Sequence, residues 1–318
     1  MFPPRTTLPQ RLKQFFSAVT QSFRCRKVRR KHIRSEPIVY QLEAYCPRQE
    51  RDDTDRGGRY ESLSELCARV GYQLPIQVVK LIARDVLREL QILHEESGVA
   101  HGDLNTNNIF LSPRDMRSLV SQLSADIQES FTPSDKLSID DVLLDFNSML
   151  TSTSSTVFKL YNVELDALGL SGLSDNRSLR PPEVILGAPH GTSADLWSLG
   201  CILYELLTGE SLFDPYFQTH DLGLSPDESH LIQIIELLGE LPQDVLSAGE
   251  YSERWFNQDG TLRIETTLYP VSLETILRSQ VEEDDFEDAY NFFNNLLQLN
   301  PEERAKPYET VNHVWFMN

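Results

Sequence analysis

After residue 61 the apolar side chains recur at helical spacing, and two helices can be predicted from their start signals. Ser62 and Glu65 have the spacing of a capping box, so a short helix should begin there. Pro75 occupies a first-turn position of the next predicted helix, whose apolar stripe runs up to Gly98. The members of this stripe are Ile76, Val79, Ile82, Ala83, Val86, Leu90 and Leu93.

The second half of the chain is also predicted to be helical. Residues 196–208 are apolar nearly all round and are followed by Gly209, which is typical of a helix at the centre of a domain with a glycine C-cap. Apolar runs at 231–238, 290–297 and 311–316 predict the remaining helices, whose apolar side chains should lie in the core.

Residues 99–111 break this helical pattern. An apolar pair, a polar stretch and a second apolar run predict a strand, a loop and another strand. The loop contains Asp103 and, five residues further on, Asn108. An Asp can orient a hydroxyl group and accept its proton, and an Asn can offer a neutral oxygen to Mg²⁺ beside a phosphate. A turn rich in Asn and Asp that carries no chemistry would explain the same residues.

Charge is distributed unevenly along the 318 residues. Residues 1–34 contain ten Lys and Arg and no acidic residue, whereas residues 35–318 contain the other nineteen together with all 48 Asp and Glu, a net charge of −29. Such an acidic body repels nucleic acid and favours basic partners or substrates. An acidic surface that is merely solvated would explain the charge as well.

The basic residues 1–34 allow three interpretations. An amphipathic helix with no acidic residue would suit a mitochondrial presequence, and the basic run 24–34 would suit nuclear import or binding to a polyanion. A disordered basic tail is the third interpretation. The apolar positions of the amphipathic helix would be Leu12, Phe15, Phe16, Val19 and Phe23.

The spacing of cysteine and histidine indicates neither a disulfide framework nor a structural metal. The four Cys form no C-x-x-C pair, which favours reduced thiols in a cytoplasmic or nuclear setting. The seven His form no H-E-x-x-H motif, so we expect no structural zinc. No apolar run approaches the roughly 18 residues that a membrane span requires.

The loop at residues 101–108 resembles the catalytic loop of the protein kinase superfamily, H-R-D-L-x-x-x-N. Phosphotransferases that act on small molecules carry a similar H-G-D-x-x-x-x-N loop, so this motif alone does not separate the two groups. The residues in register with the protein kinase motif are His101, Asp103, Leu104 and Asn108, with Gly102 in place of the Arg.

Two downstream segments favour the protein kinases. Residues 180–183 resemble the A-P-E box, and residues 193–201 resemble the D-x-W-S-x-G-C helix, a pair that small-molecule kinases lack. The resemblance runs from about Ser62 to Phe316. Within the protein kinases it leans to the SR-protein-kinase-like serine/threonine kinases, which also lack the loop Arg and carry an insert after the loop. It implies an α+β protein-kinase-like fold, mainly the helical C-lobe.

The resemblance also implies a division of the chain. Residues 1–34 would be a basic tail, disordered or targeting, and 35–61 a remnant of the N-lobe and hinge with one strand-like run at 38–42. Residues 62–318 would form the C-lobe, with an insert at about 112–155. Neither a G-x-G-x-x-G loop nor a Val-Ala-Ile-Lys-like strand is found. We therefore expect a truncated or absent N-lobe sheet, and the nucleotide-binding residues are unknown.

The loop residues acquire roles by the same resemblance. Asp103 would be the catalytic base and Asn108 a ligand of Mg²⁺, with ATP as the phosphate donor, while His101 would be structural. Asn105 stands at a catalytic position where the family has a Lys that helps neutralise the transferring phosphoryl group, so transition-state stabilisation should be weaker. Gly102 removes the Arg that responds to activation-loop phosphorylation, so we predict no such switch.

Two registers compete for the second metal ligand, the Asp of the D-F-G element. Asn162 follows the strand-like residues 158–161, and Asp145 follows the apolar residues 142–144. Asn162 is favoured because Glu183 of the A-P-E-like box then lies 21 residues downstream instead of 38, nearer the usual family separation. A neutral Asn would hold Mg²⁺ more weakly than a carboxylate does.

Three charged residues are expected to support the scaffold. By resemblance, Asp195 should accept hydrogen bonds from the backbone of the loop, although a plain interaction with its own helix dipole would also explain an Asp at this position. Glu183 should form a buried ion pair with Arg304.

Two functions from different classes fit these residues. The chain would be a serine/threonine kinase that uses ATP and Mg²⁺ on basic, Arg/Ser-rich proteins, with its activity weakened or lost. The alternative is a catalytically inactive pseudokinase scaffold that binds basic protein partners and no cofactor. A natural start of the chain elsewhere would explain the absence of the G-x-G-x-x-G loop and of the Val-Ala-Ile-Lys-like strand equally well.

Overall fold

The structure of the chain is a computed structural model that describes residues 61–96, 98–111, 158–160, 176–217, 219 and 223–317. These residues belong to the second of the two units into which the chain divides, residues 49–318. The predictions for residues 1–60 and for the insert at 112–155 lie outside the described residues.

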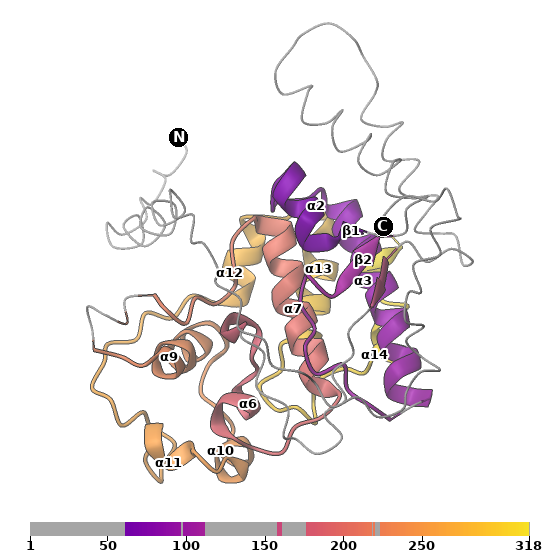
Figure 1. Ribbon diagram of the computed structural model, residues 1–318. Coiled ribbons are helices and arrows are strands. Elements are labelled where there is room, and N and C mark those ends of the chain that lie inside the picture. Colours follow the sequence, from indigo (N-terminus) through magenta and orange to yellow (C-terminus); the bar gives the residue numbers. More distant parts are fainter. Residues whose placement is uncertain are drawn as a thin grey trace, which may run out of the picture. The chain divides into compact units, whose positions relative to one another are not determined.

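Helix α7 (Ser193–Thr208) runs through the middle of the mainly helical arrangement in Figure 1. Most of its sixteen residues are buried, and helices α3 (Ile76–Gln91) and α13 (Glu283–Leu296) pack against it. Gly209 ends the helix in the left-handed region, with a φ of 78° and its N–H bonded to the Glu205 carbonyl oxygen at 2.7 Å. The predicted buried helix with a glycine C-cap is confirmed, and it begins three residues before the apolar run.

The start signals at Ser62 and Pro75 also predict the helices correctly. Helix α2 (Leu63–Val70) has the capping box, because Glu65 N–H donates to Ser62 Oγ at 3.2 Å and Ser62 N–H donates to Glu65 Oε2 at 3.1 Å. Pro75 is the N-cap of α3, which carries the apolar stripe. The last part of that stripe continues as a short π-helix, η1 (Ile92–Glu96), which ends shortly before the loop.

A small antiparallel sheet lies beside these helices, with strands in the order β1 (Glu61–Ser62), β2 (Ile109–Leu111) and β3 (Phe158–Leu160). Strand β2 is central and pairs with β1 on one edge and β3 on the other. The strand predicted after the loop is confirmed as β2. The strand predicted before the loop is wrong, since residues 99–100 have no regular secondary structure and both edges of β2 are already paired.

The remaining described elements follow in the second half of the chain. The predicted runs 231–238 and 290–297 fall in α9 and α13, and Leu297 is the C-cap residue of α13. The elements are η2 (Arg177–Leu179), α6 (Pro182–Leu186), α9 (Pro226–Leu238), α10 (Gln243–Ala248), α11 (Ser252–Trp255), α12 (Leu273–Arg278), α14 (Pro307–Thr310) and η3 (Val314–Phe316).

The helix predicted over residues 311–316 is wrong as a single element. Val311 is the C-cap of the short helix α14, and a separate 3-10 helix, η3, follows after a turn. Tertiary packing explains the break, because Trp315 and Phe316 place their rings 4.6 and 5.2 Å from the ring of Phe292. Trp315 and Phe316 are therefore in the core as expected, although in a different local conformation, whereas Val314 is 50% exposed, so the prediction is wrong for that residue.

None of the helices within the described ranges is long and apolar enough to cross a membrane. The core is formed mainly by α2, α3, α7, α9 and α13, and it extends to β2, β3 and the aromatic residues of η3. The described part of the chain is thus mainly helical with a minor sheet, which agrees with a helical C-lobe.

The close packing of α7 on α13 gives a test of the fold. A Cβ atom at Gly200 would lie 2.9 Å from Leu297 Cδ2 and 3.2 Å from Leu296 Cβ, whereas one at Gly191 would meet nothing within 4 Å. We expect Gly200→Val to lower the free energy of unfolding by about 1–3 kcal/mol through overpacking, measured by urea denaturation. Gly191→Val is the matched control, and an equal effect of the two would contradict the packing.

Candidate functional site

The loop that follows η1 brings Asp103 and Asn108 together. The Nδ2 of Asn108 donates to the backbone oxygen of Asp103 at 2.8 Å and to its carboxylate Oδ2 at 3.1 Å. Asn108 is buried, and Asp103 is only partly exposed. The amide therefore fixes the direction of the carboxylate. An oriented carboxylate at a partly exposed position can accept a proton from a hydroxyl group.

Asn105 is turned into the loop. Its Nδ2 donates to the Asp103 carbonyl oxygen at 3.0 Å, and its Oδ1 accepts from the N–H of Asn107 at 2.9 Å. The side chain is 7% exposed. Sequence reasoning considered only the positive charge that is missing at this position, whereas the structure gives Asn105 a part in holding the turn around Asp103.

Asp195, near the start of α7, binds the backbone of the loop through its carboxylate. Its Oδ2 accepts from the N–H of His101 at 2.7 Å, and its Oδ1 accepts from the N–H of Gly102 at 3.1 Å. Gly102 has a φ of 81°, a backbone conformation that L side chains rarely adopt. Asp195 is 2% exposed, so these hydrogen bonds satisfy a buried carboxylate and fix the entry to the loop.

His94 is a site residue that sequence reasoning missed. It lies in the π-helix η1, and its Nε2 is 2.8 Å from Oδ2 of Asp195, with both side chains buried. Asp195 thus joins η1, the loop and α7. The one sequence signal for His94 is its position at the end of the apolar stripe of the preceding helix, immediately before the loop.

A buried ion pair connects the A-P-E-like segment to the chain after α13. Arg304 binds Glu183 with two hydrogen bonds, Nη1 to Oε1 at 2.7 Å and Nη2 to Oε2 at 3.1 Å. The same guanidinium donates to the backbone oxygens of Ser193 and Gln298. The two carboxylate oxygens and the two backbone oxygens together accept hydrogen bonds from all three nitrogens of the Arg304 guanidinium.

Removal of the Glu183 side chain tests how much the stability of the fold depends on the ion pair between Glu183 and Arg304. We expect Glu183→Ala to reduce the free energy of unfolding by about 3–5 kcal/mol, because the buried guanidinium of Arg304 loses its counter-charge. Glu302→Ala, at an exposed position, should change it far less. Chemical denaturation measures both, and similar small losses for the two variants would contradict a structural role for the pair.

Strand β3 contacts both β2, the strand that follows the loop, and helix α3. Its residues pair antiparallel with β2, and the N–H of Phe158 donates to Oδ2 of the fully buried Asp85 at 3.3 Å. Sequence reasoning assigned no function to Asp85 or to the other charged residues of this helix. The strand expected before Asn162 is therefore present as far as Leu160, and both Asn162 and its alternative Asp145 lie outside the described residues.

The described loop offers oxygen ligands of the kind that Mg²⁺ prefers. They are the carboxylate of Asp103 and the side-chain amide of Asn108, which supply one negative charge between them. In the ranges that the structure describes, no group of three or more His, Cys, Asp or Glu is arranged to hold a metal ion. The loop therefore fits a magnesium ion that takes most of its ligands from phosphate, water and residues elsewhere.

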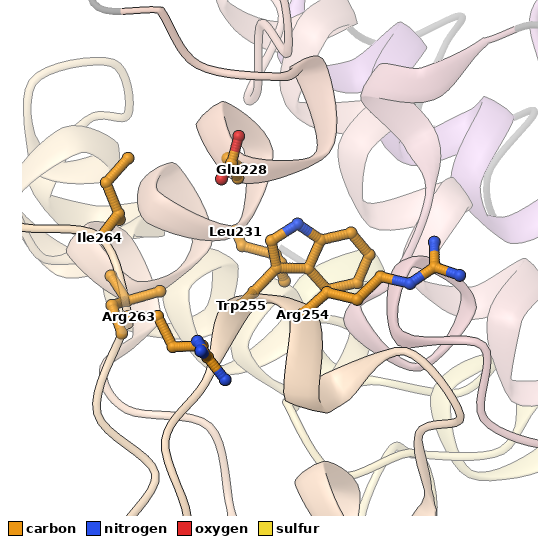
Figure 2. A pocket seen from close by; sticks show the side chains of 7 residues that line it. Glu228, Leu231, Arg254, Trp255, Arg263 and Ile264 are labelled. Carbon is orange, nitrogen blue, oxygen red and sulfur yellow. The ribbon is translucent and has the colours of Figure 1, made fainter.

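A small pocket lies between α9, α11 and the segment 262–264 (Figure 2). Trp255 crosses it in front of Leu231, and Arg263 and Ile264 stand on one side. It encloses about 20 Å³, room for little more than one water molecule. This volume excludes a nucleotide, and the residues of the loop do not line it.

His230 in α9 is a buried titratable group that gives the fold a dependence on pH. Its ring lies 5.0 Å from that of Phe213, and it is 1% exposed. Desolvation, assisted by the positive charge of Arg180, lowers the pKa of His230 from 6.5 to about 3. In the folded protein the imidazole is therefore neutral throughout the physiological range.

Stability should consequently fall on mild acidification. Below pH 6.5 the unfolded chain binds a proton at His230 that the folded chain does not bind until about pH 3. From pH 7 to pH 5 this difference removes about 2 kcal/mol of unfolding free energy. We expect His230→Phe to lose this part of the pH dependence in urea titrations, and His190→Gln to keep it. An unchanged slope in the first variant would contradict the burial of a neutral imidazole.

Comparison with known proteins adds to this geometry. Residues 172–316 match the family model described as the protein kinase domain. The chain is 37% identical over 184 residues to the serine/threonine-protein kinase SKY1 of Saccharomyces cerevisiae, covering 54% of this chain and 24% of the yeast protein.

Two further relatives have related descriptions. The chain is 28% identical over 272 residues to the serine/threonine-protein kinase SRPK of Physarum polycephalum, covering 76% of this chain and 61% of that protein. It is 37% identical over 142 residues to SRSF protein kinase 3 of Homo sapiens, covering 44% and 24%. The chain thus spans less than two thirds of the length of each of these three relatives.

Proposed function

Because the chain belongs to the protein kinase family and has serine/threonine kinases as relatives, we propose that it transfers the γ-phosphate of ATP to Ser or Thr of basic, Arg/Ser-rich proteins, at a reduced rate. The observation that carries this proposal is the carboxylate of Asp103, held by Asn108 on a loop whose backbone is fixed by Asp195. The proposal assigns no residue to the binding of the nucleotide.

Asp103 acts as the general base in this proposal. Its carboxylate accepts the proton of the substrate hydroxyl as the oxygen attacks the phosphorus atom, and Asn108 keeps that carboxylate in place. Asn108 and Asn162 would hold Mg²⁺, which, when bound, neutralises part of the phosphate charge. The pairing of β3 with β2 supports the register in which Asn162 occupies the metal position.

Two neutral residues support the reduced rate. Asn105 has no charge to place on the transferring phosphoryl group, and its amide is engaged within the loop. Asn162 supplies an amide oxygen where a carboxylate would hold the metal more strongly. Loss of one electrostatic stabiliser of a transition state typically costs about 10²–10³ in rate.

The same two residues favour a second candidate function, a catalytically inactive scaffold that binds basic proteins. The structural hydrogen bonds of Asp195 and the ion pair between Glu183 and Arg304 are intact. A binding function needs this scaffold and the acidic surface. It needs neither a lysine in place of Asn105 nor a strong metal site.

Charge also guides the choice of partner. Residues 35–318 carry a net charge of −29, which attracts basic segments and slows the approach of nucleic acid. The human relative is described as a kinase of SRSF proteins, and Arg/Ser-rich partners of this chain would suit its charge. Cys67 and Cys201 are free and buried, which supports a cytoplasmic or nuclear location for the protein.

Phosphate transfer from [γ-³²P]ATP to an Arg/Ser peptide tests the proposal on the natural full-length protein. We expect Asp103→Asn to lower the transfer rate about 100-fold or more, because the base is lost. Asp259→Asn is the control, since Asp259 is exposed and its carboxylate accepts hydrogen bonds from the nearby Thr261.

The outcomes separate the two candidate functions. Equal rates for wild type and Asp103→Asn would show that the loop does not perform the transfer. Absence of transfer by the wild type, together with retained binding of the peptide, would select the scaffold.

A further inference from the structure

The turn between α12 and α13 (Figure 1) contains an exposed serine that precedes a run of acidic residues. Ser279 is the C-cap residue of α12, and its Oγ donates to the carbonyl oxygen of Ile276 at 2.7 Å. Residues 282–285 have the sequence Glu-Glu-Asp-Asp, and the first three of them are exposed. Acidic side chains that begin three positions after a hydroxyl group are a charge pattern that a kinase with a basic substrate groove can select.

The same spacing of a serine and an acidic residue occurs at other described positions, but without the acidic run. The serines with this spacing in the described ranges are Ser62, Ser211, Ser225, Ser247 and Ser279. Ser62 and Ser225 form capping boxes at the starts of α2 and α9. Ser211 bonds the side chain of Glu205, and Ser247 lies within α10, where its Oγ donates to the Gln243 carbonyl oxygen at 2.6 Å. Ser279 alone among them precedes four consecutive acidic residues.

A positive charge already lies beside Ser279. The Arg278 guanidinium donates to both carboxylate oxygens of Glu283, at 2.9 and 3.2 Å, and to Glu274 at 3.3 Å. Its Cζ lies 3.8 Å from the centre of the Phe286 ring in α13. Arg278 therefore connects the end of α12 to the start of α13. Because these ion pairs are exposed, they are weak, and a stronger anion can replace the carboxylate.

We propose that Ser279 is a phosphorylation site for a serine/threonine kinase that selects acidic residues after the acceptor. Ser279 Oγ attacks the γ-phosphorus of ATP, the bond from that phosphorus to the bridging oxygen breaks, and ADP leaves. The hydroxyl proton passes to the catalytic base of the modifying enzyme. A separate enzyme carries out this step, because an acidic body such as that of this chain does not attract an acidic acceptor sequence.

The phosphate then takes Arg278 from Glu283. It carries a charge of about −1.5 to −2 at pH 7 and three acceptor oxygens, so it binds a guanidinium more strongly than a carboxylate does. Arg278 directly precedes Ser279 in the chain and is exposed. The phosphate also stands at the C-terminal end of α12, where the helix dipole disfavours negative charge. Both effects weaken the connection between α12 and α13.

Incubation of the full chain with purified casein kinase and [γ-³²P]ATP tests the site, with a second incubation that omits the added kinase. We expect label that depends on the added kinase, and mass spectrometry should place it on Ser279. Ser279→Ala should lose most of this label, whereas Ser247→Ala, at the exposed serine of α10, should keep it. Absence of label from the wild type, or equal labelling of wild type and Ser279→Ala, overturns the site.

Two further variants test the acidic pattern without changing the serine. Glu282→Gln removes the charge three positions after Ser279, and we expect it to lower kcat/KM for labelling about fivefold, as loss of one exposed ion pair with the modifying kinase should. Glu287→Gln, five residues further along the chain, should change it less than about twofold. Thermal unfolding shows whether both variants are folded. An equal effect of the two would contradict recognition of the acidic run.

Hydrogen exchange measured by mass spectrometry tests the effect on Arg278. We expect the phosphorylated chain to exchange faster than the unmodified chain over α12 and the first turn of α13. Arg278→Gln should give the same faster exchange without a phosphate, and phosphorylation of that variant should add little. Unchanged exchange in the phosphorylated wild type would overturn the transfer of Arg278 to the phosphate.

Discussion

The carboxylate of Asp195 is the constraint on which the arrangement of the site depends. It accepts the backbone N–H groups of His101 and Gly102 and contacts the ring of His94, so three parts of the chain meet at one buried group. A buried carboxylate without donors would be strongly unfavourable, and this one is satisfied only when the loop has its observed path. Fixing the loop backbone in turn places Asp103 beside Asn108. The position of the candidate base is therefore determined by a buried residue outside the loop itself.

Buried charge in the rest of the described chain serves the same purpose. Arg304 and Glu183 join two segments separated by 121 positions, and Lys80 joins α3 to Asp285 of α13 at 2.8 Å. Such pairs add little net stability compared with apolar residues of the same shape, but breaking one partner is costly. They therefore specify which elements meet. Other acidic residues of the described ranges, among them Asp284, Glu302 and Glu303, are exposed and available to attract basic molecules.

Much of the helical fold could be predicted from the sequence because its signals are local. The capping box at Ser62 and the glycine after α7 depend only on neighbouring residues, and both were found where expected. The strand before the loop and the single helix over 311–316 were wrong because tertiary contacts decide them. At the site, Asp103 and Asn108 were found by motif. His94 and Asp85 were missed because their importance comes from partners 101 and 73 positions away.

The side chain of Asn105 links the structure of the loop to its chemistry. It donates to the Asp103 carbonyl oxygen and also accepts the N–H of Asn107, and a lysine could not do the second because it has no acceptor. Asn107 is exposed, so with a lysine at position 105 its N–H could bond only water or another group, and the turn would lose this link within the loop. In this chain the positive charge is absent and the turn is closed by an amide. The missing positive charge and the firmly held loop are therefore two consequences of the same residue.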